Sequence, residues 1–213
     1  MENKSKQQVI LIGGGGHAKA CYEIISSNPH VEILGYLDKS PSLENSKIKI
    51  KYLGSDERAK DLINTAYFIN CIGHIGESQL REKITNLYAS LGAKFLNFQS
   101  QTAFISSYSK IEKGTIVMHH ATIQAESIIG SHCIINDHAL IEHDCVIGDN
   151  VHVSTGVLVN GNVHIGNNCF IGSGAVIKNG VSIGENVFVG MGSIVTKSIK
   201  EGKRVFGNPA RIF

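Results

Sequence analysis

The stretch Ile135-Asn-Asp-His-Ala-Leu-Ile141-Glu-His-Asp-Cys-Val-Ile147-Gly-Asp-Asn-Val-His-Val153 has isoleucine or valine at every sixth position. The same spacing continues in both directions, without a gap, from Ile111 to Val195. A strand pattern repeats every two residues and a helix pattern about every 3.6, so a strict period of six requires another architecture. We therefore predict a hexapeptide-repeat prism, in which three hexapeptides form the three sides of one coil.

The side chains between the aliphatic positions support this prism. A small or aliphatic residue, such as Cys145, follows each aliphatic position by four places, where we expect it to let the chain turn the corner. Gly, Asn, Asp and His, which tolerate positive φ, crowd the remaining places. Fourteen complete repeats from Ile111 to Ile194 predict between four and five coils.

The first ~95 residues lack this period and alternate predicted strands with predicted helices, which is typical of a small parallel α/β sheet. The expected strands are Val9–Ile12, Val31–Leu37 and Tyr67–Ile72, and the expected helices are 18–27, 55–63 and 80–91. We therefore predict an α/β + all-β chain with two domains. A Rossmann-like domain covers residues 1–95, and a β-helix domain covers 96–213, with repeats over 111–199 and a C-terminal tail over 200–213.

The composition argues against several classes of protein. Twenty basic and eighteen acidic residues give a net charge of +2 without a long basic run, so nucleic-acid binding is not indicated. No stretch approaches the ~18 apolar residues of a membrane span. The apolar run after the polar residues 1–8 is too short for a signal-peptide core, so the cytoplasm is the expected compartment.

The five cysteines are an odd number and include no CxxC pair. Cys133, Cys145 and Cys169 occupy the small position of the repeat, where a free cysteine packs as a small hydrophobe. Cys21 lies in a predicted helix and Cys71 at the end of a predicted strand. We expect all five to be packing residues.

Gly13-Gly-Gly-Gly16-His17 connects a predicted strand to a predicted helix. Outward-pointing N–H groups and the positive end of a helix make such a turn suitable for phosphate. Gly13-x-Gly15-x-x-Ala18, with Asp38 further on, also partly fits a dinucleotide fingerprint, but the domain is short for a complete dinucleotide fold. A tight turn alone and an NAD site remain alternatives to the favoured mononucleotide or nucleotide-sugar site.

Seven of the ten histidines lie in the repeat half: His119, His120, His132, His138, His143, His152 and His164. His143 stands out because Asp144 follows it, and because its neighbours one coil of 18 residues away, Ala125 and Gly161, are small and leave space around the ring. A neutral imidazole beside a carboxylate is the usual general base near neutral pH. The alternative is an exposed corner histidine.

A metal site is the competing interpretation of these histidines. His120 and His138 are 18 residues apart and should stack, and His138 is five residues from His143. The gamma-class carbonic anhydrases hold zinc or iron with three histidines on a β-helix. That family lacks an N-terminal domain of this type, and no third histidine here has the required position, so we expect no metal.

These features together resemble the bacterial sugar O-/N-acetyltransferases, which pair a small N-terminal α/β domain with a left-handed β-helix. The family includes the UDP-4-amino-sugar N-acetyltransferases of the bacillosamine pathway, the perosamine N-acetyltransferases and the sialic acid O-acetyltransferases. The resemblance covers nearly the whole chain. It rests on the glycine loop with His17, Tyr36-Leu-Asp38, Ile72-Gly73, the unbroken repeats, the segment 136–144 and Gly207-Asn-Pro-Ala-Arg211.

The resemblance implies roles for particular residues. His143 matches the general base, and Asp144 matches the acidic residue that raises its basicity. The residues implied for the substrate are Gly15, Gly16, His17, Asp38, Lys39, Gly73 and Asn136, and those implied for acetyl-CoA are His152, Gly161, Ser173 and Met191. Lys39 replaces a second acidic residue that is common in the family, and His74 replaces a common asparagine.

The activity implied is acetyl-CoA-dependent N-acetylation of a nucleotide-linked 4-amino-4,6-dideoxyhexose for a bacterial surface glycan. The transfer would be direct, with acetyl-CoA as co-substrate and without a metal. O-acetylation of sialic acid or a polysaccharide precursor, and a nucleotide-sugar sensor without catalysis, are the alternatives. Related enzymes also imply a homotrimer with active sites between subunits. The sequence leaves the nucleobase (UDP, dTDP or GDP) and the sugar stereochemistry open.

Overall fold

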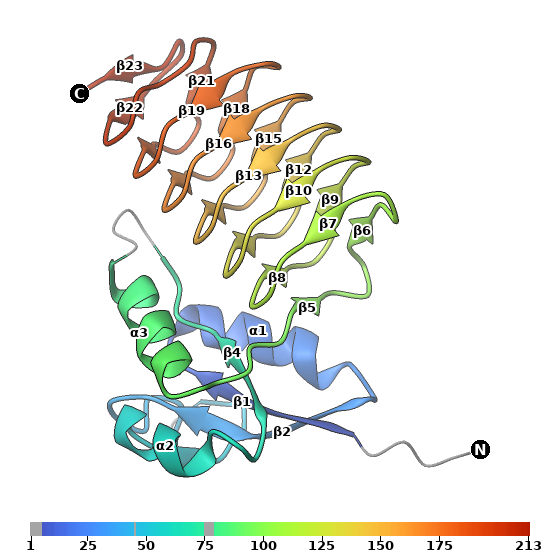
Figure 1. Cartoon of the computed structure of the whole chain (residues 1–213), viewed down its shortest axis with the longest axis vertical. Coiled ribbons are helices and arrows are strands. Elements are labelled where there is room, and N and C mark those ends of the chain that lie inside the picture. The colour runs from blue at the N-terminus through green and yellow to red at the C-terminus, as the bar shows by residue number, and fades with distance from the viewer. Residues whose placement is uncertain (1–5, 45, 75–78) are drawn as a thin grey trace. The chain divides into compact units, whose positions relative to one another are not determined.

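The computed structural model of the chain describes residues 6–44, 46–74 and 79–213 (Figure 1). The contacts within the chain divide it into two compact units. The first comprises residues up to Gly73 together with Gln79–Phe98, and the second comprises Gln99–Phe213 together with His74. Over the described ranges, no helix is both long and apolar enough to cross a membrane.

The first unit is built on a four-stranded parallel sheet in the order β3-β2-β1-β4. Its strands are β1 (Gln7–Ile12), β2 (Val31–Leu37), β3 (Tyr52–Gly54) and β4 (Tyr67–Asn70). Its helices are α1 (Gly16–Ser26), α2 (Ala59–Leu62), α3 (Gln79–Ser90) and a 3-10 turn at Asp56–Arg58. The predicted α/β sheet is thus confirmed. The sequence did not predict β3, because three half-buried residues are too few to show an alternating pattern.

Strand β1 is central in this sheet, and Val9–Ile12 are almost completely buried. Chain order along the sheet reverses at β1, since β2 lies on one side of it and β4 on the other. Ligands of open α/β sheets bind where this reversal leaves a crevice at the carboxyl ends of the strands. The turn at residues 13–15 follows β1 and the turn at 71–73 follows β4, so both belong to this point of the fold.

The second unit is a parallel β-helix of stacked coils with mostly two-residue strands (Figure 1). The five-strand face contains β7 (Lys110–Ile111), β10 (Ile128–Ile129), β13 (Val146–Ile147), β16 (His164–Ile165) and β19 (Ser182–Ile183). The six-strand face contains β6 (Phe104–Ile105), β9 (Thr122–Ile123), β12 (Leu140–Ile141), β15 (Leu158–Val159), β18 (Val176–Ile177) and β21 (Ile194–Val195).

The eight-strand face contains β5 (Phe98–Gln99), β8 (Ile116–Val117), β11 (Ile134–Ile135), β14 (His152–Val153), β17 (Phe170–Ile171), β20 (Phe188–Val189), β22 (Arg204–Phe206) and β23 (Arg211–Ile212). At the C-terminal end of this face, β22 and β23 pair antiparallel. Every strand pair from β6 to β21 joins residues 18 apart, as the predicted coil length requires.

The interior of the prism confirms the predicted six-residue pattern. From β8 to β21 the second residue of each strand, such as Ile141 or Val159, points inward and is buried with small residues such as Ala139 and Cys145 in one continuous core. The corner agrees with the expected positive φ of its Gly, Asn, Asp and His residues, and it differs from the prediction in the place of the small residue. The residue before the small one adopts positive φ, as at Asp144 with φ 60°, while the small residue fills the interior beside the turn.

This corner conformation predicts how substitutions affect stability. Asn186 is exposed and has φ 56°, a conformation in which asparagine and glycine are tolerated and a β-branched residue is strained. We expect Asn186→Val to lower the free energy of unfolding by about 1–2 kcal/mol, since a left-handed conformation costs that much for an ordinary side chain. Asn186→Gly is the matched control and should remain close to the native chain. Equal urea-denaturation midpoints for the valine and glycine variants would contradict this account.

Candidate active site

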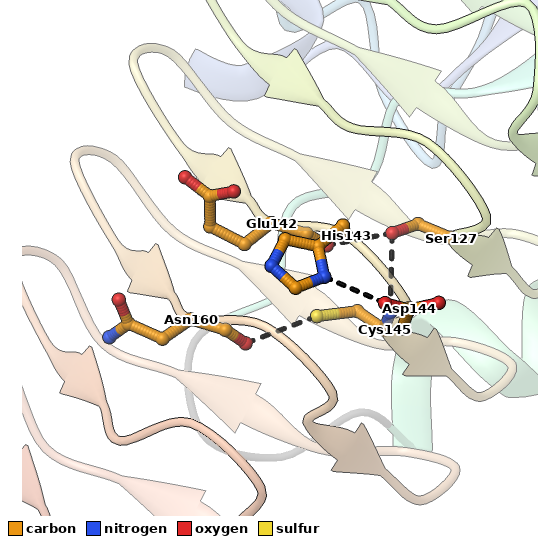
Figure 2. A network of polar contacts seen from close by, with 6 residues as sticks. All are labelled: Ser127, Glu142, His143, Asp144, Cys145 and Asn160. Carbon is orange, nitrogen blue, oxygen red and sulfur yellow. Dashed lines mark hydrogen bonds and ion pairs between the residues drawn. The ribbon is translucent and has the colours of Figure 1, made fainter.

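His143 and Asp144 lie in the turn that follows β12 (Figure 2). Asp144 has φ 60°, and this turn conformation brings its Oδ2 within 2.7 Å of Nδ1 of His143. Both side chains are exposed, at 63% for His143 and 56% for Asp144. Because Nδ1 is hydrogen-bonded to the carboxylate, Nε2 is the ring nitrogen that can bind or deprotonate a ligand.

The neighbouring coils hold this turn in place. The hydroxyl of Ser127 donates to the carbonyl oxygen of Glu142 at 2.7 Å and accepts from the backbone N–H of Cys145 at 3.3 Å. The thiol of Cys145 donates to the carbonyl oxygen of Asn160 on the next coil. Figure 2 shows the Ser127 bonds beside the imidazole and the Cys145–Asn160 bond below it, with the Glu142 carboxylate pointing away from the His143–Asp144 pair. The sequence did not predict these hydrogen bonds, because Ser127 occupies the small position of the repeat and was expected only to pack there.

Gly161 lies directly against the His143 ring. A Cβ atom at this position would come within 2.7 Å of Cε1 and 2.8 Å of Nε2 of His143. The space that the sequence predicted beside the imidazole is therefore occupied by the ring itself. A side chain at position 161 would have to displace the histidine.

The carboxylate determines the proton affinity of the imidazole. The hydrogen bond to Asp144, together with the charges of Asp144 and Glu142, raises the pKa of His143 above its ordinary value. Such a ring accepts a proton readily and holds it as an imidazolium ion beside a carboxylate. The pair therefore has the geometry and the electrostatics of a general base.

His152 takes a different position, on the outer side of the eight-strand face. Its side chain is 7% exposed, and Nδ1 lies 2.6 Å from the carbonyl oxygen of His74. The ring of Phe170 packs edge-on against it, with centroids 5.3 Å apart. A protonated Nδ1 donating to this carbonyl fixes the tautomer of a neutral His152, so the second nitrogen, Nε2, carries the lone pair.

The remaining repeat residues predicted for ligand binding lie at a different corner from His143. Asn136, Ser173 and Met191 lie in the turns that join the eight-strand face to the six-strand face, which we call the Asn136 edge. His143 and Gly161 lie in the turns that join the six-strand face to the five-strand face, which we call the His143 edge. Within one chain, the six-strand face separates the two groups.

Few contacts within the protein hold the side chains of the Asn136 edge. Oδ1 of Asn136 accepts from the backbone N–H of Asp137 at 2.9 Å. The hydroxyl of Ser173 lies 2.8 Å from that of Ser154 on the preceding coil, and Met191 is 82% exposed. Neighbouring coils approach each other closely at this edge, because a Cβ at Gly172 would lie 2.5 Å from the backbone nitrogen of Met191. A side chain at position 172 would therefore collide with the next coil.

The glycine loop in the first unit connects β1 to α1, as predicted. A Cβ at Gly14 would collide with Ser42 and Tyr36, so this position has to be glycine. Gly15 and Gly16 have no atom near their Cβ positions, and Gly15 is the N-cap of α1. The backbone at the helix start is thus approachable by a ligand, as phosphate binding requires.

Asp38 stabilises this loop from within the protein. Its Oδ2 accepts from the N–H of Gly14 and the hydroxyl of Ser42, both at 2.8 Å, and its Oδ1 accepts from the N–H of Lys39. The side chain of Lys39 is exposed. The carboxylate that the sequence assigned to a ligand is therefore also engaged in holding the loop. The sequence did not predict the hydrogen bond of Ser42 to Asp38, because residues 39–51 have the charged composition of an exposed loop.

His17 and Gly73 meet at the switch point of the sheet. A Cβ at Gly73 would lie 3.2 Å from Cβ of His17, so the glycine allows the turn after β4 to approach the first turn of α1. Nε2 of His17 lies 3.4 Å from Sγ of Cys21, one helical turn further along. The structure thus brings together Gly15, Gly16, His17, Asp38 and Gly73, all of which were predicted for the substrate.

The histidines of the rival metal interpretation stack as expected but form no cluster. The rings of His120 and His138 are 5.0 Å apart and nearly parallel, at 18°. Within the described ranges, no group of three or more His, Cys, Asp or Glu side chains is arranged to hold a metal ion. All five cysteines are buried, and none of them forms a disulfide.

Family comparisons match both halves of the chain. Residues 8–88 match the PglD N-terminal domain family. Residues 126–161 match the bacterial transferase hexapeptide family (six repeats), and residues 162–197 match the hexapeptide repeat of succinyl-transferase. A comparison with curated protein sequences gives no match.

Several solved structures are similar along almost the whole chain. The acetyltransferase domain of PglB from Neisseria gonorrhoeae FA1090, in complex with acetyl coenzyme A, is 29% identical with a TM-score of 0.90, covering 98% of this chain and 100% of that one. PerB from Caulobacter crescentus, in complex with CoA and GDP-perosamine, is 28% identical with a TM-score of 0.86, covering 97% of each chain. WeeI from Acinetobacter baumannii AYE is 28% identical with a TM-score of 0.81, covering 98% and 100%.

The fold and these matches define an acyltransferase of the hexapeptide-repeat class. The chain combines a PglD N-terminal domain with hexapeptide repeats and is similar along almost its whole length to bacterial sugar acetyltransferases, which confirms the predicted resemblance.

The electrostatics of the pair give a direct prediction. We expect histidine proton NMR to report a pKa for His143 above that of an ordinary histidine. Asp144→Asn should lower it, because the neutral amide stabilises the imidazolium ion less than the carboxylate does. Glu142→Gln is the matched control with the same change in charge one residue away from His143, and it should have a smaller effect. An Asp144→Asn chain with the native pKa would show that the hydrogen bond is not the cause.

Proposed function

We propose that the protein transfers the acetyl group of acetyl-CoA to the amine of a nucleotide-linked 4-amino-4,6-dideoxyhexose. The observation that carries the proposal is the 2.7 Å contact of Asp144 with Nδ1 of His143, which leaves Nε2 as the basic nitrogen. The similarity to enzymes crystallised with acetyl-CoA, or with CoA and GDP-perosamine, supports the donor and the class of acceptor.

In the proposed reaction, the amine nitrogen attacks the thioester carbonyl while Nε2 of His143 removes a proton from it. The new C–N bond forms as the C–S bond breaks, and the CoA sulfur leaves as a thiol with a proton returned by the imidazolium ion. Asp144 stabilises that ion. A backbone N–H of a neighbouring coil would stabilise the oxyanion, a contribution of about 3 kcal/mol in other enzymes. Neutral His152 does not take this role, because its Nδ1–H is used on the carbonyl oxygen of His74 and its Nε2 is an acceptor. Since the neutral imidazole is the base, activity should increase as the pH rises through the pKa of His143.

The glycine loop is our candidate for the nucleotide end of the acceptor. Its open helix start at Gly15 and Gly16 suits the diphosphate, and His17 with Gly73 lies at the crevice of the sheet. Asp38 and Lys39, at the end of β2, would contact the base. We assign Asn136 to the acceptor pocket, and His152, Gly161, Ser173 and Met191 to the acetyl-CoA groove.

A homotrimer would reconcile the separation of the two edges. The outer positions of the six-strand face are mostly apolar, with Phe104 and Leu158 exposed and Leu140 half-buried. Apolar strips of this kind are usually covered by association. Three copies with this face turned toward a threefold axis would bring the His143 edge of one chain against the Asn136 edge of the next. The base and the groove residues would then share one site.

The assay for the proposed function measures release of CoA thiol from acetyl-CoA. UDP-, dTDP- and GDP-linked 4-amino-4,6-dideoxyhexoses serve as acceptors. We expect turnover with one preferred nucleotide, and a fall in kcat of ~10²–10⁴ in His143→Ala, the usual contribution of a general base. His164→Ala, which removes an exposed histidine of the five-strand face, is the matched control and should retain activity. Absence of turnover with every amino sugar would refute the acceptor and favour a hydroxyl acceptor such as sialic acid.

The subunit arrangement has its own test by complementation. His143→Ala removes the base from one edge, and Ser173→Tyr would fill the groove at the other, so each variant alone should be inactive. Random mixing of the two chains should restore roughly a quarter of the native activity, since one contact in four would combine two intact edges. Light scattering should show trimers in all samples. An inactive mixture of trimers would contradict a site shared between chains.

A further inference from the structure

Three side chains that the proposed function does not use, Cys21, Cys71 and Arg81, come together with His17 in the first unit. His17 and Cys21 lie four residues apart on α1 and so share one side of the helix. Cys71 follows β4, and Arg81 belongs to α3. Cys21, Cys71 and Arg81 are at most 2% exposed, whereas His17 is half-buried.

The contacts in this group are specific. Sγ of Cys21 lies 3.4 Å from Nε2 of His17, and the thiol of Cys71 is hydrogen-bonded to Cys21. The guanidinium of Arg81 donates to the carbonyl oxygens of Asn70 and Ile72, both at 2.7 Å, which holds its positive charge beside the two sulfurs. Cys21 therefore has a hydrogen-bond donor in Cys71, a positive charge in Arg81 and a ring in His17 that can become positively charged.

This environment distinguishes the two thiols. The hydrogen bond from Cys71 is the strongest influence, and with His17 and Arg81 it outweighs burial and lowers the pKa of Cys21 to about 5. Burial and the neighbouring Cys21 raise the pKa of Cys71 well above its usual range. Cys71 thus acts as the donor of the pair and Cys21 as the acceptor. The repeat cysteine Cys169 shows the contrary behaviour, since burial raises its pKa to about 12.

We propose that Cys21 is a positioning residue that holds Nε2 of His17, so that Nδ1 of this ring remains a hydrogen-bond donor for the phosphate of the nucleotide-linked sugar. Two proton arrangements are available to the pair. A Cys21 thiol donates to Nε2, and a neutral His17 then carries its proton on Nδ1. A Cys21 thiolate accepts from Nε2–H, and the imidazolium ion carries a second proton on Nδ1. Nδ1 is a donor in both arrangements, as an anionic ligand requires.

The other observations at the loop agree with this role. Among the residues that the structure describes, Cys21 provides the one hydrogen bond of the His17 ring. Gly73 packs against Cβ of His17 and Gly15 and Gly16 leave the adjacent helix start uncovered. The sulfur therefore sets the orientation of a ring beside the backbone where phosphate is expected. The inference rests on the proposed function, because it takes the nucleotide-linked sugar as the ligand of this loop.

The kinetic test compares Cys21→Ala, Cys21→Ser and the matched control Cys169→Ala, which removes a buried thiol from the repeat half. We expect Cys21→Ala to raise the KM for the nucleotide sugar ~10-fold or more, the usual effect of losing a charge-assisted hydrogen bond. The KM for acetyl-CoA should stay unchanged. Cys21→Ser should recover most of the loss, because its hydroxyl can donate to Nε2. Equal increases of both KM values in all three variants would indicate general destabilisation and overturn the proposal.

A second test needs no substrate and so separates this proposal from the proposed function. Nitrogen-15 NMR of the native chain should show Nδ1 of His17 protonated, and Cys21→Ala should move the proton of the neutral ring to Nε2. Thiolate absorbance that develops between pH 4 and pH 7 should disappear in Cys21→Ala and persist in Cys169→Ala. A native His17 with unprotonated Nδ1 would overturn the proposal even if the Cys21 variants fail to fold. Absence of turnover with every amino sugar would refute only the proposed function.

Discussion

The structure of the second unit depends on one packing constraint, the filling of a narrow triangular interior by one branched aliphatic side chain per side. Ile141, Val159 and their equivalents stack 18 residues apart and leave no room for a change of register. Protein interiors are packed to crystal density, so an inserted residue would turn the following aliphatic side chains out of the core. All polar chemistry is therefore confined to the turns, where Asp144 and the other corner residues adopt positive φ.

The constraint also decides which residues one chain can combine. Turns of the same edge repeat every 18 residues, so His143 has Gly161 as its permanent neighbour. Asn136 and His143 are seven residues apart and lie across the six-strand face from each other. A rigid prism cannot bend to bring them together. A site that uses both edges requires a second chain, and the apolar character of the intervening face is consistent with that requirement.

The β-helix was predictable because its pattern is periodic and local. The 18-residue spacing predicted even the stacking of His120 on His138. The short strand β3 lacked enough residues to form a pattern. The double use of Asp38, and the contacts of Cys21 with Cys71 and Arg81, depend on which groups the fold brings together from distant parts of the chain. Cys21 reads as a packing residue in the sequence because neither Cys71 nor Arg81 is near it along the chain.

The exposure of the His143–Asp144 pair limits how strongly the carboxylate can stabilise the imidazolium ion in a single chain. Water screens the charges of a pair that is more than half exposed, so the carboxylate contributes least to the imidazolium ion in the free chain. Excluding water would strengthen the same interaction without moving either residue. A neighbouring chain and the two substrates would supply that exclusion at the His143 edge. Assembly would then do more than collect residues, because it would also give the base its working environment.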